Sequence, residues 1–249
     1  MIQSAREKTA AVVDNVWFAY PGAPWVLQGV SFSVPQGARV ALLGPSGAGK
    51  TTLLKMLAGF LQPQRGAVQV LGHRLQGRMP SDLRRKVGYV PQHLGLVRGL
   101  TALENTLLGT LGSCGGLGPL VGRFPADLVR QAEEYLSLLG LGDKVHERVM
   151  NLSGGQRQRV AIARTLMQAP RLILADEFVS DLDVVTAMQI LEAMGRLSTE
   201  RGFTLIMSLH DVHLVQSFAD QAIVLKGGRV VAQEAAAAMQ RERLRAMLA

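Results

Sequence analysis

The segment Gly44–Thr52 constrains the fold of this chain more than any other part of the sequence. Gly44, Gly49, Lys50 and Thr51 fit the pattern G-x-x-x-x-G-K-[ST] of a phosphate-binding loop. Glycines let the backbone approach an anion closely, and the loop amides, together with the positive end of the next helix, attract phosphate. We expect Lys50 to contact the β- and γ-phosphates of a nucleotide and the Thr51 hydroxyl to bind Mg²⁺. The other loop residues expected to line the site are Pro45, Ser46, Gly47, Ala48 and Thr52.

The sequence on either side of the loop supports nucleotide binding. Arg39–Leu43 is apolar after its first residue and predicts a strand, and Lys50–Phe60 predicts a helix. A glycine turn without a ligand is the alternative. A strand, a loop of this pattern and a helix in direct succession favour the nucleotide site.

Composition and charge narrow the class of protein. The 249 residues suffice for one large domain or a domain with a subdomain, and 48% hydrophobic with 18% charged residues is typical of a globular chain. No apolar run approaches the ~20 residues that span a bilayer, and Met1–Ala11 lacks a signal-peptide core, so we expect a cytoplasmic protein. The single cysteine, Cys114, excludes an internal disulfide and agrees with a reducing compartment. The net charge of +8 favours acidic partners such as nucleotides, nucleic acid or an anionic membrane surface.

Periodicity and turn residues predict the remaining elements. The predicted strands are Val12–Trp17, Ser31–Val34, Val68–Leu71, Val87–Val90, Leu172–Ala175, Thr204–Ser208, and the hairpin of Ala222–Leu225 with Arg229–Ala232. The predicted helices are 101–111, 127–139, 153–167, 183–197, 211–219 and a C-terminal helix that begins in Ala235–Ala238. Capping boxes at Thr101–Glu104 and Ser153–Gln156 mark two helix starts, and Gly109–Gly122 predicts a flexible loop.

A second motif, Leu172–Glu177, predicts the other half of a nucleotide triphosphatase site. Its first four residues are apolar, as a parallel strand buried on both faces requires, and two carboxylates follow. An acidic pair at a strand end often only caps a helix. After a phosphate loop, however, we expect Asp176 to hold Mg²⁺ through water and Glu177 to polarise the attacking water as a general base.

The third motif is Leu-Ser-Gly-Gly-Gln at Leu152–Gln156. Ser153 is expected to cap a helix whose positive end, with the amides of Gly154 and Gly155, can receive a γ-phosphate. The motif resembles the signature of ATP-binding-cassette (ABC) ATPases, and with the two nucleotide motifs the resemblance extends over nearly the whole chain. It implies a single ABC ATPase domain over 1–249, which is an α/β, RecA-like P-loop NTPase core with a mixed sheet, an N-terminal antiparallel β-subdomain and an inserted α-helical subdomain. The expected boundaries are 1–91 for the β-subdomain and first part of the core, 92–150 for the helical subdomain, and 151–249 for the signature helix and the rest of the core.

The resemblance also implies further site residues. Tyr20 matches the aromatic residue that stacks on adenine, and Gln92 matches the glutamine that joins the core to the helical subdomain and touches Mg²⁺ and the attacking water. His210 matches the histidine that contacts the γ-phosphate. Ser180–Asp183 matches a loop that crosses a dimer interface, so Asp183 is expected at the nucleotide. The alternatives are that Tyr20 is an ordinary strand tyrosine, that Gln92 is a polar loop residue, and that His210 is a structural histidine.

In this family two cassettes meet head to tail. The phosphate loop of one copy then faces Ser153, Gly154, Gly155 and Gln156 of the other, with ATP between them. A symmetric pair has two such shared sites. Bound ATP favours closure of the pair of cassettes, and hydrolysis of ATP favours its opening. This change between two states drives transport in the family.

The sequence departs from the family pattern after Glu177, because Phe178 stands where proline is usual. Phenylalanine leaves φ freer than proline does, which puts the rigidity of the Ser180–Asp183 loop in question. Asp181 adds a negative charge where small residues are common in the family. The catalytic carboxylate is intact, so we expect ATPase activity.

One cassette without a membrane span implies a separate integral membrane permease, which places the chain at the cytoplasmic face of the membrane. The permease's short cytoplasmic helix would dock near Leu94–Gly109, where Leu94, Leu96, Val97 and Leu100 are either exposed for docking or packed inside.

Finer resemblance addresses the solute. Leu96–Gly109, the glycine-rich insertion after it, and Ser208–Leu214 resemble the ATPases of phosphonate, phosphite or hypophosphite importers. The solute itself would be selected by the permease and a substrate-binding protein, and import of a polar amino acid is the nearest alternative.

A nucleic-acid-associated ATPase of the same fold is the alternative from another class, and the positive charge favours it. Gln92–Met150 is too short for the coiled coil of the DNA-repair relatives and lacks sustained heptads. The translation-factor relatives carry two cassettes in one chain, whereas this chain has one. No nucleic-acid partner is therefore expected.

Overall fold

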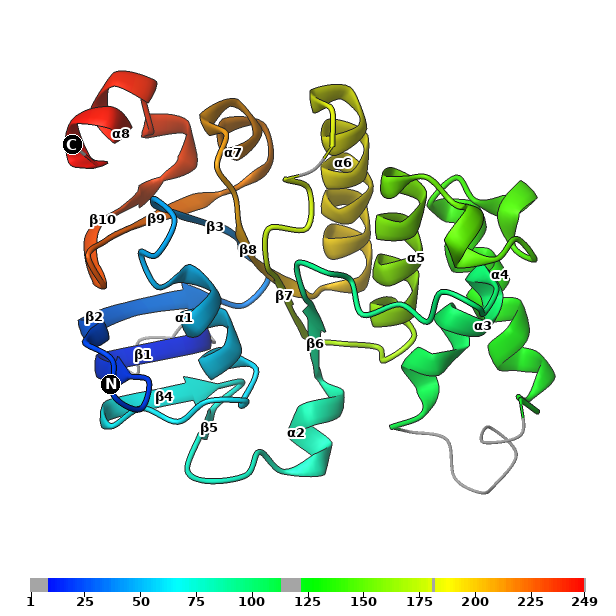
Figure 1. Cartoon of the computed structure of the whole chain (residues 1–249), viewed down its shortest axis with the longest axis horizontal. Helices are drawn as coiled ribbons and strands as arrows, with labels where there is room; N and C mark the ends of the chain where they lie inside the picture. Colours follow the sequence, from blue (N-terminus) through cyan, green and yellow to red (C-terminus); the bar gives the residue numbers. More distant parts are fainter. Residues whose placement is uncertain (1–8, 113–121, 181, 249) are drawn as a thin grey trace, which may run out of the picture.

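The computed structural model describes residues 9–112, 122–180 and 182–248. Figure 1 shows three parts side by side, which are an N-terminal sheet, a central sheet and a helical region. The helices of that region are α3 (Ala102–Leu107), α4 (Ala126–Leu138) and α5 (Gly154–Leu166). The mixed sheet, the N-terminal antiparallel sheet and the inserted helices confirm the predicted fold class.

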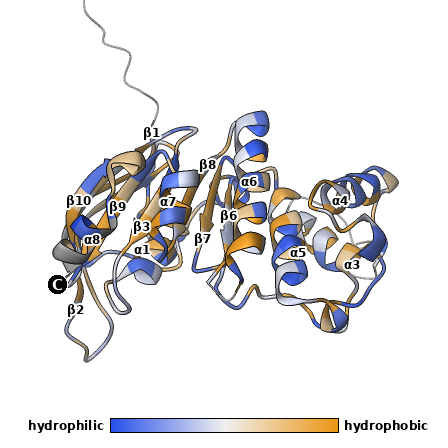
Figure 2. Cartoon of the chain, turned by 90° about the horizontal axis from the view of Figure 1, so that it is seen from above, coloured by the Kyte–Doolittle hydropathy of each residue, from blue (hydrophilic) through white to orange (hydrophobic). Residues whose placement is uncertain are grey.

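The central sheet has the strand order β10-β9-β3-β8-β7-β6. The strands are β3 (Arg39–Leu43), β6 (Val87–Val90), β7 (Leu172–Ala175), β8 (Thr204–Ser208), β9 (Gln221–Lys226) and β10 (Arg229–Ala235). From β9 to β6 neighbouring strands pair in parallel, whereas β10 pairs antiparallel with β9 in the predicted hairpin. The parallel strands are buried along nearly their whole length, as their continuous apolar sequences require, and they form an orange centre in Figure 2.

The N-terminal sheet is antiparallel, with the order β2-β1-β4-β5. Its strands are β1 (Thr9–Ala19), β2 (Trp25–Pro35), β4 (Arg65–Val70) and β5 (His73–Arg74). Buried and exposed residues alternate along much of β2, so one face packs inward and the other meets solvent. Helix α1 (Lys50–Leu57) lies between that face and the central sheet, where it buries Leu53, Leu54 and Leu57.

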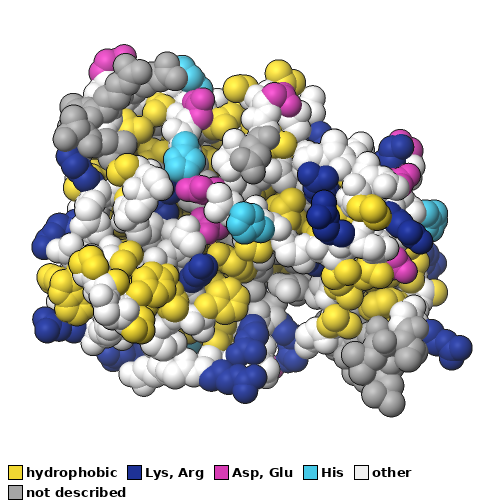
Figure 3. Space-filling model, in the orientation of Figure 1, with side chains coloured by type: hydrophobic (Ala, Val, Ile, Leu, Met, Phe, Trp, Pro, Cys, Tyr) yellow, Lys and Arg dark blue, Asp and Glu magenta, His cyan; other side chains and the backbone are white. Residues whose placement is uncertain are grey.

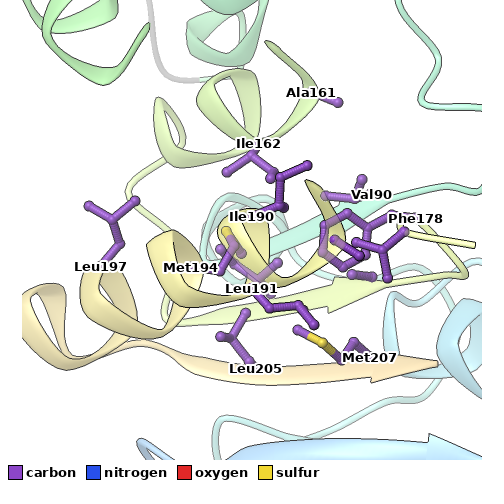
Figure 4. Close-up of a cluster of buried hydrophobic side chains, with 14 of the residues drawn as sticks. Val90, Ala161, Ile162, Phe178, Ile190, Leu191, Met194, Leu197, Leu205 and Met207 are labelled. Atoms are coloured by element: carbon purple, nitrogen blue, oxygen red, sulfur yellow. The ribbon is translucent and has the colours of Figure 1, made fainter. Parts of the chain in front are cut away.

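The opposite face of the central sheet is covered by α5, α6 (Val184–Arg201) and α7 (Val212–Phe218). Figure 4 shows Ile162 of α5 with Ile190 and Met194 of α6 above Leu205 and Met207 of β8. Apolar residues recur along α6 at the helical period, which turns one stripe toward the sheet. Packing on both faces holds the strands in place, and the strand ends are fixed with them.

The helical region starts at the predicted capping box. The amide of Glu104 donates to Thr101 Oγ1 over 3.1 Å, and the amide of Thr101 donates to Glu104 Oε2 over 2.7 Å. Three 3-10 turns, η1 (Leu108–Thr110), η3 (Gly142–Lys144) and η4 (Val149–Asn151), belong to the region. Helices α3 and α4 pack against α5, so the core of the insert is continuous with that of the central sheet. The domain boundaries at 92 and 150 stay predictions.

Helix predictions were wrong at several boundaries. The helix predicted over 183–197 continues as α6 to Arg201 and ends where Gly202 adopts a left-handed φ of 71°. The helix predicted over Lys50–Phe60 ends at Leu57, because Gly59 adopts a left-handed φ of 77°. The C-terminal helix predicted to begin within Ala235–Ala238 begins at Arg241 as α8 (Arg241–Leu248). The reason is that Ala235 still pairs in β10, and the next three alanines form a 3-10 turn, η5 (Ala236–Ala238).

Some features fall outside the predictions or outside the described residues. Strand β5 and the short helix α2 (Ser81–Arg85) were not predicted. Most of the predicted loop Gly109–Gly122 lies outside the described residues, as do Cys114 and Asp181. No helix in the described part of the chain combines the length and the apolar composition needed to cross a membrane.

Candidate functional site

Four parallel strands of the central sheet end at the same edge, and a predicted site residue follows each of them. The phosphate loop follows β3, Gln92 follows β6, Asp176 and Glu177 follow β7, and His210 follows β8. Open α/β sheets bind ligands outside the carboxyl ends of their strands. Residues from four distant parts of the sequence therefore meet at one site.

Glycines hold the phosphate loop close to its surroundings. A Cβ on Gly44 would lie 2.3 Å from the carbonyl oxygen of Leu225, and a Cβ on Gly49 would lie 2.7 Å from the Leu27 side chain. Open space remains where Gly47 would carry a Cβ. Among the described residues, no side chain caps the N-terminus of α1, which follows the loop. The loop thus offers free helical amides beside an open space, which fits an anionic ligand such as a nucleotide phosphate.

Lys50 is folded back over this loop. Its side chain is only 4% exposed, and its Nζ donates to the carbonyl oxygens of Gly44 and Pro45 over 2.9 and 3.2 Å. The same Nζ lies 3.6 Å from Glu177 Oε1. A buried ammonium requires such partners because burial removes its hydration. The positive charge is therefore held between the loop and the acidic pair.

Asp176 is buried at the end of β7 and accepts hydrogen bonds from three hydroxyl groups. Thr51 Oγ1 and Ser208 Oγ each donate to its Oδ1 over 3.1 Å, and the Tyr89 hydroxyl donates to its Oδ2 over 3.5 Å. These bonds replace the hydration that a buried carboxylate loses. Burial, and then the charge of Asp176, raise the pKa of the Tyr89 phenol, so Tyr89 remains a donor at neutral pH.

Glu177 is contacted by side chains from two neighbouring strand ends. Its Oε1 lies 2.8 Å from His210 Nε2, and its Oε2 accepts from Gln92 Nε2 over 3.3 Å. Its backbone has a left-handed φ of 46°, which is unusual for a residue with a side chain. Figure 3 shows acidic and histidine side chains gathered near the middle of this face. The structure thus brings Lys50, Gln92 and His210 together around the Glu177 carboxylate.

Tyr20 lies at the margin of the same site. Its hydroxyl is 3.3 Å from Thr52 Oγ1, and its ring meets that of Phe18 edge to face with 5.0 Å between centroids. The residue is 38% exposed, which leaves part of the ring accessible to a flat ligand.

The oxygen groups around Asp176 fit a magnesium ion. Mg²⁺ prefers oxygen ligands, and it is usually bound by one or two protein groups together with substrate phosphates and water. Thr51 Oγ1 and Asp176 Oδ1 are such a pair. The described residues contain no cluster of three or more His, Cys, Asp or Glu side chains that could hold a metal without a substrate. Gln92, the third predicted ligand, contacts Glu177 and not this pair.

The signature residues and Asp183 form two separate helix caps that lie close together, and no hydrogen bond among the described residues joins either cap to the phosphate loop. Ser153 and Gln156 form the predicted capping box, with bonds of 3.2 and 2.9 Å. Asp183 caps α6 by accepting from the amide of Thr186 over 2.9 Å. Hydrogen bonding to the side chain and then to the backbone of Thr186 lowers the pKa of Asp183. A Cβ on Gly155 would lie 2.8 Å from the Thr186 side chain. Within the described parts of the chain, no hydrogen bond links these groups to Gly44–Thr52.

Sequence reasoning missed Ser208 and Tyr89 as members of the site. Both lie in strands that were predicted correctly. Tyr89 gave no clear signal, since a tyrosine is common in strands. For Ser208 the signal was a hydroxyl at the carboxyl end of a strand that neighbours the one bearing Asp176.

Arg164 of α5 fixes the segment that follows Gln92. Its guanidinium donates to the carbonyl oxygens of Gly95 and Leu94 over 2.7 and 2.5 Å. Of the apolar residues considered for docking, Leu94 and Leu96 pack against the core, whereas Val97 is 47% exposed. The segment is thus partly buried and partly available to a partner.

Phe178, at the position where the family pattern has proline, is almost completely buried. Figure 4 shows its ring beside Val90 in the core above the central sheet. In addition, Ser180 Oγ donates to the carbonyl oxygen of Glu177 over 2.7 Å. Side-chain packing and this bond anchor the start of the Ser180–Asp183 loop.

A family model described as "ABC transporter" matches residues 27–180, a stretch that contains the phosphate loop, Gln92, the signature and the acidic pair. The chain therefore belongs to the ABC transporter family of ATP-binding cassettes. It binds ATP, and the reaction of this class is ATP hydrolysis.

Curated relatives cover most of the chain. The phosphonates import ATP-binding protein PhnC 2 of Synechococcus sp. is 40% identical over 222 residues, which is 88% of this chain and 82% of the relative. The phosphonates import ATP-binding protein PhnC of Trichormus variabilis is 42% identical over 206 residues, which is 83% of this chain and 84% of the relative.

Solved structures share the fold. The cassette MJ0796, in a dimeric post-hydrolysis state bound to ADP and Pi, matches with a TM-score of 0.79 and 30% sequence identity. The match covers 91% of this chain and 98% of that one.

Proposed function

We propose that this chain hydrolyses ATP to drive the uptake of a small phosphorus-containing anion, of the phosphonate, phosphite or hypophosphite class, through a separate permease. The observation that carries the ATPase assignment is the group formed by Lys50, Asp176 and Glu177 at one sheet edge. The names of the relatives at 40 and 42% identity support the solute class.

In the proposed mechanism, each strand end supplies one function. Lys50 and the loop amides bind the β- and γ-phosphates, and Thr51 and Asp176 hold Mg²⁺. Mg²⁺, when bound, neutralises charge on the phosphate oxygens. Glu177 accepts the proton of the attacking water, which must lie within hydrogen-bond reach of its carboxylate.

Gln92 and His210 orient the reacting groups in this proposal. Both touch the Glu177 carboxylate, at 3.3 and 2.8 Å, so they can fix its direction and contact the water and the γ-phosphate. The accessible part of the Tyr20 ring receives the adenine.

The second wall of each ATP site is proposed to be a second copy of this chain. Ser153, Gly154 and Gly155 stand at the start of α5, beside Thr186 of α6, and in one copy no hydrogen bond among the described residues ties them to the phosphate loop. Their helix end suits a γ-phosphate that is bound to the partner's loop. A homodimer with two shared sites satisfies this arrangement, and the dimeric state of MJ0796 supports it.

The partners beyond the dimer are a membrane permease and, indirectly, a substrate-binding protein. The segment after Gln92, with Val97 exposed and Arg164 holding its backbone, is the proposed docking point for the permease. The chain then lies at the cytoplasmic face of the membrane.

The test of the solute class is uptake by cells. Removing this chain from the organism that encodes it should abolish uptake of radiolabelled methylphosphonate, phosphite or hypophosphite, and resupplying the chain should restore it. Resupplying Glu177→Gln should not. If the cells instead lose uptake of a polar amino acid and keep uptake of all three phosphorus anions, the proposed solute class is wrong and a polar amino acid takes its place.

A further inference from the structure

Ser208 contacts both residues of the acidic pair. It is the last residue of β8, and its side chain is completely buried. Its Oγ accepts from the amide of Glu177 over 2.7 Å and donates to Asp176 Oδ1 over 3.1 Å. One hydroxyl therefore bridges the backbone of one carboxylate residue and the side chain of the other.

The backbone of Glu177 needs such support. A left-handed φ of 46° is a sparsely populated conformation for a residue with a Cβ, and it persists only where the surroundings determine it. Ser208 holds the amide of Glu177, and Ser180 Oγ holds its carbonyl oxygen. The bonds on either side of Glu177 hold the turn that directs its carboxylate toward His210 and Lys50.

We propose that Ser208 is a positioning residue for ATP hydrolysis, which sets the direction of the Glu177 carboxylate and the orientation of the Asp176 carboxylate. This inference rests on the proposed roles of the two carboxylates. Because Ser208 is completely buried, it acts through Asp176 and Glu177 and touches neither ATP nor water.

The two carboxylates depend on Ser208 to different degrees. Asp176 keeps hydrogen bonds from Thr51 and Tyr89 when the Ser208 hydroxyl is lost. The amide of Glu177, in contrast, has Ser208 as its acceptor and would be left without one. The loss should therefore impair the step that uses Glu177 and leave ATP binding largely intact.

The experiment compares Ser208→Ala with Ser198→Ala as a matched control. Ser198 is also a buried serine, and its Oγ donates to the carbonyl oxygen of Phe203 over 2.7 Å, away from the site. Ser208→Ala should lower kcat for ATP hydrolysis about 10- to 100-fold, because small misplacements of a catalytic group have effects of this order. Its affinity for a fluorescent ATP analogue should stay within about threefold of wild type. Ser198→Ala should keep wild-type kcat.

Two further variants guard against a purely structural explanation. Ser208→Thr keeps the hydroxyl and should recover most of the lost kcat. If thermal unfolding shows that this variant does not fold, a double-mutant cycle decides: Ser208→Ala added to Glu177→Gln should cause little further loss, because one residue acts through the other.

The outcomes separate this inference from the proposed function. If Glu177→Gln abolishes turnover while Ser208→Ala keeps wild-type kcat, or loses no more than Ser198→Ala does, the positioning role of Ser208 is overturned and that of Glu177 stands. If Glu177→Gln itself retains full turnover, the proposed role of Glu177 fails and the positioning role fails with it.

Discussion

Glu177 and Lys50 lie close together at this site but differ in burial, backbone conformation and proposed role. Glu177 is partly exposed and has a left-handed backbone, whereas Lys50 is buried and bonded to two carbonyl oxygens of its own loop. Their side chains approach to 3.6 Å, so the proposed base and the proposed phosphate-binding charge share one space. Changes at these two positions should affect different parts of the reaction.

Glu177→Gln should retain ATP binding and lose turnover. The amide has the shape of the carboxylate but cannot accept the proton of the attacking water, so we expect kcat to fall at least about 100-fold. Equilibrium binding of ATP checks that binding is retained, and steady-state hydrolysis on the same preparation checks that turnover is lost. Turnover close to wild type would exclude Glu177 as the base.

Lys50→Ala should weaken the binding of ATP. Charge-assisted hydrogen bonds contribute about 1.5–3 kcal/mol, which corresponds to roughly a 10- to 100-fold loss in affinity or in kcat/KM. Lys144→Ala is the matched control, because Lys144 is a surface lysine whose ammonium lies 3.8 Å from Asp143, and surface pairs of this kind contribute little. Equal ATP affinity and turnover in both variants would contradict the phosphate-loop assignment.

At the scale of elements, predictions succeeded where the signal is local. Both capping boxes lie within four consecutive residues and were read from the sequence, and the apolar run Leu172–Ala175 identified a central strand. The start of α8 was missed because β10 continues to Ala235, which depends on pairing with Gln221 and not on alanine's helix preference. Contacts between strand ends, such as Ser208 with Asp176, depend on register and could not be read from either segment alone.

The capping box of α3 should contribute stability that depends on pH. Hydrogen bonds from the backbone amide and then the hydroxyl of Thr101 lower the pKa of Glu104. A lowered folded-state pKa means that the contribution is complete above the usual value of about 4.3 and is lost as pH falls through the folded-state value.

Glu104→Ala should therefore lower the free energy of unfolding at pH 7, by about 0.5–1 kcal/mol because Glu104 is exposed. The difference from wild type should shrink as the solution is made more acidic than pH 4. Denaturant unfolding of both proteins across pH 3 to 7 measures it. A difference that stays constant over this range would show that the Glu104 charge has no part in the cap.

At the scale of the whole molecule, the two sheets and α1 place half of an ATP site on one edge of the central sheet. The resemblance of three sequence motifs to those of ABC ATPases was enough to predict this architecture, because the strands, loops and helices around the motifs make the match specific. The proposed other half, Ser153–Gln156, lies beside the start of α6 and within one copy is not joined to the phosphate loop by any hydrogen bond among the described residues. A single chain therefore accounts for nucleotide binding, and the proposed second copy accounts for hydrolysis.

Mixing two inactive variants tests this shared site most directly. Lys50→Ala removes the proposed phosphate-binding charge, and Ser153→Arg blocks the signature surface, so each alone should keep only a small fraction of the wild-type rate of ATP hydrolysis. A mixed pair restores one complete site, and random pairing of an equal mixture should give up to about a quarter of the wild-type rate. Ser137→Arg, the same substitution at an exposed position on α4, should keep wild-type activity. A mixture no more active than the two variants measured separately would contradict a site formed between two copies.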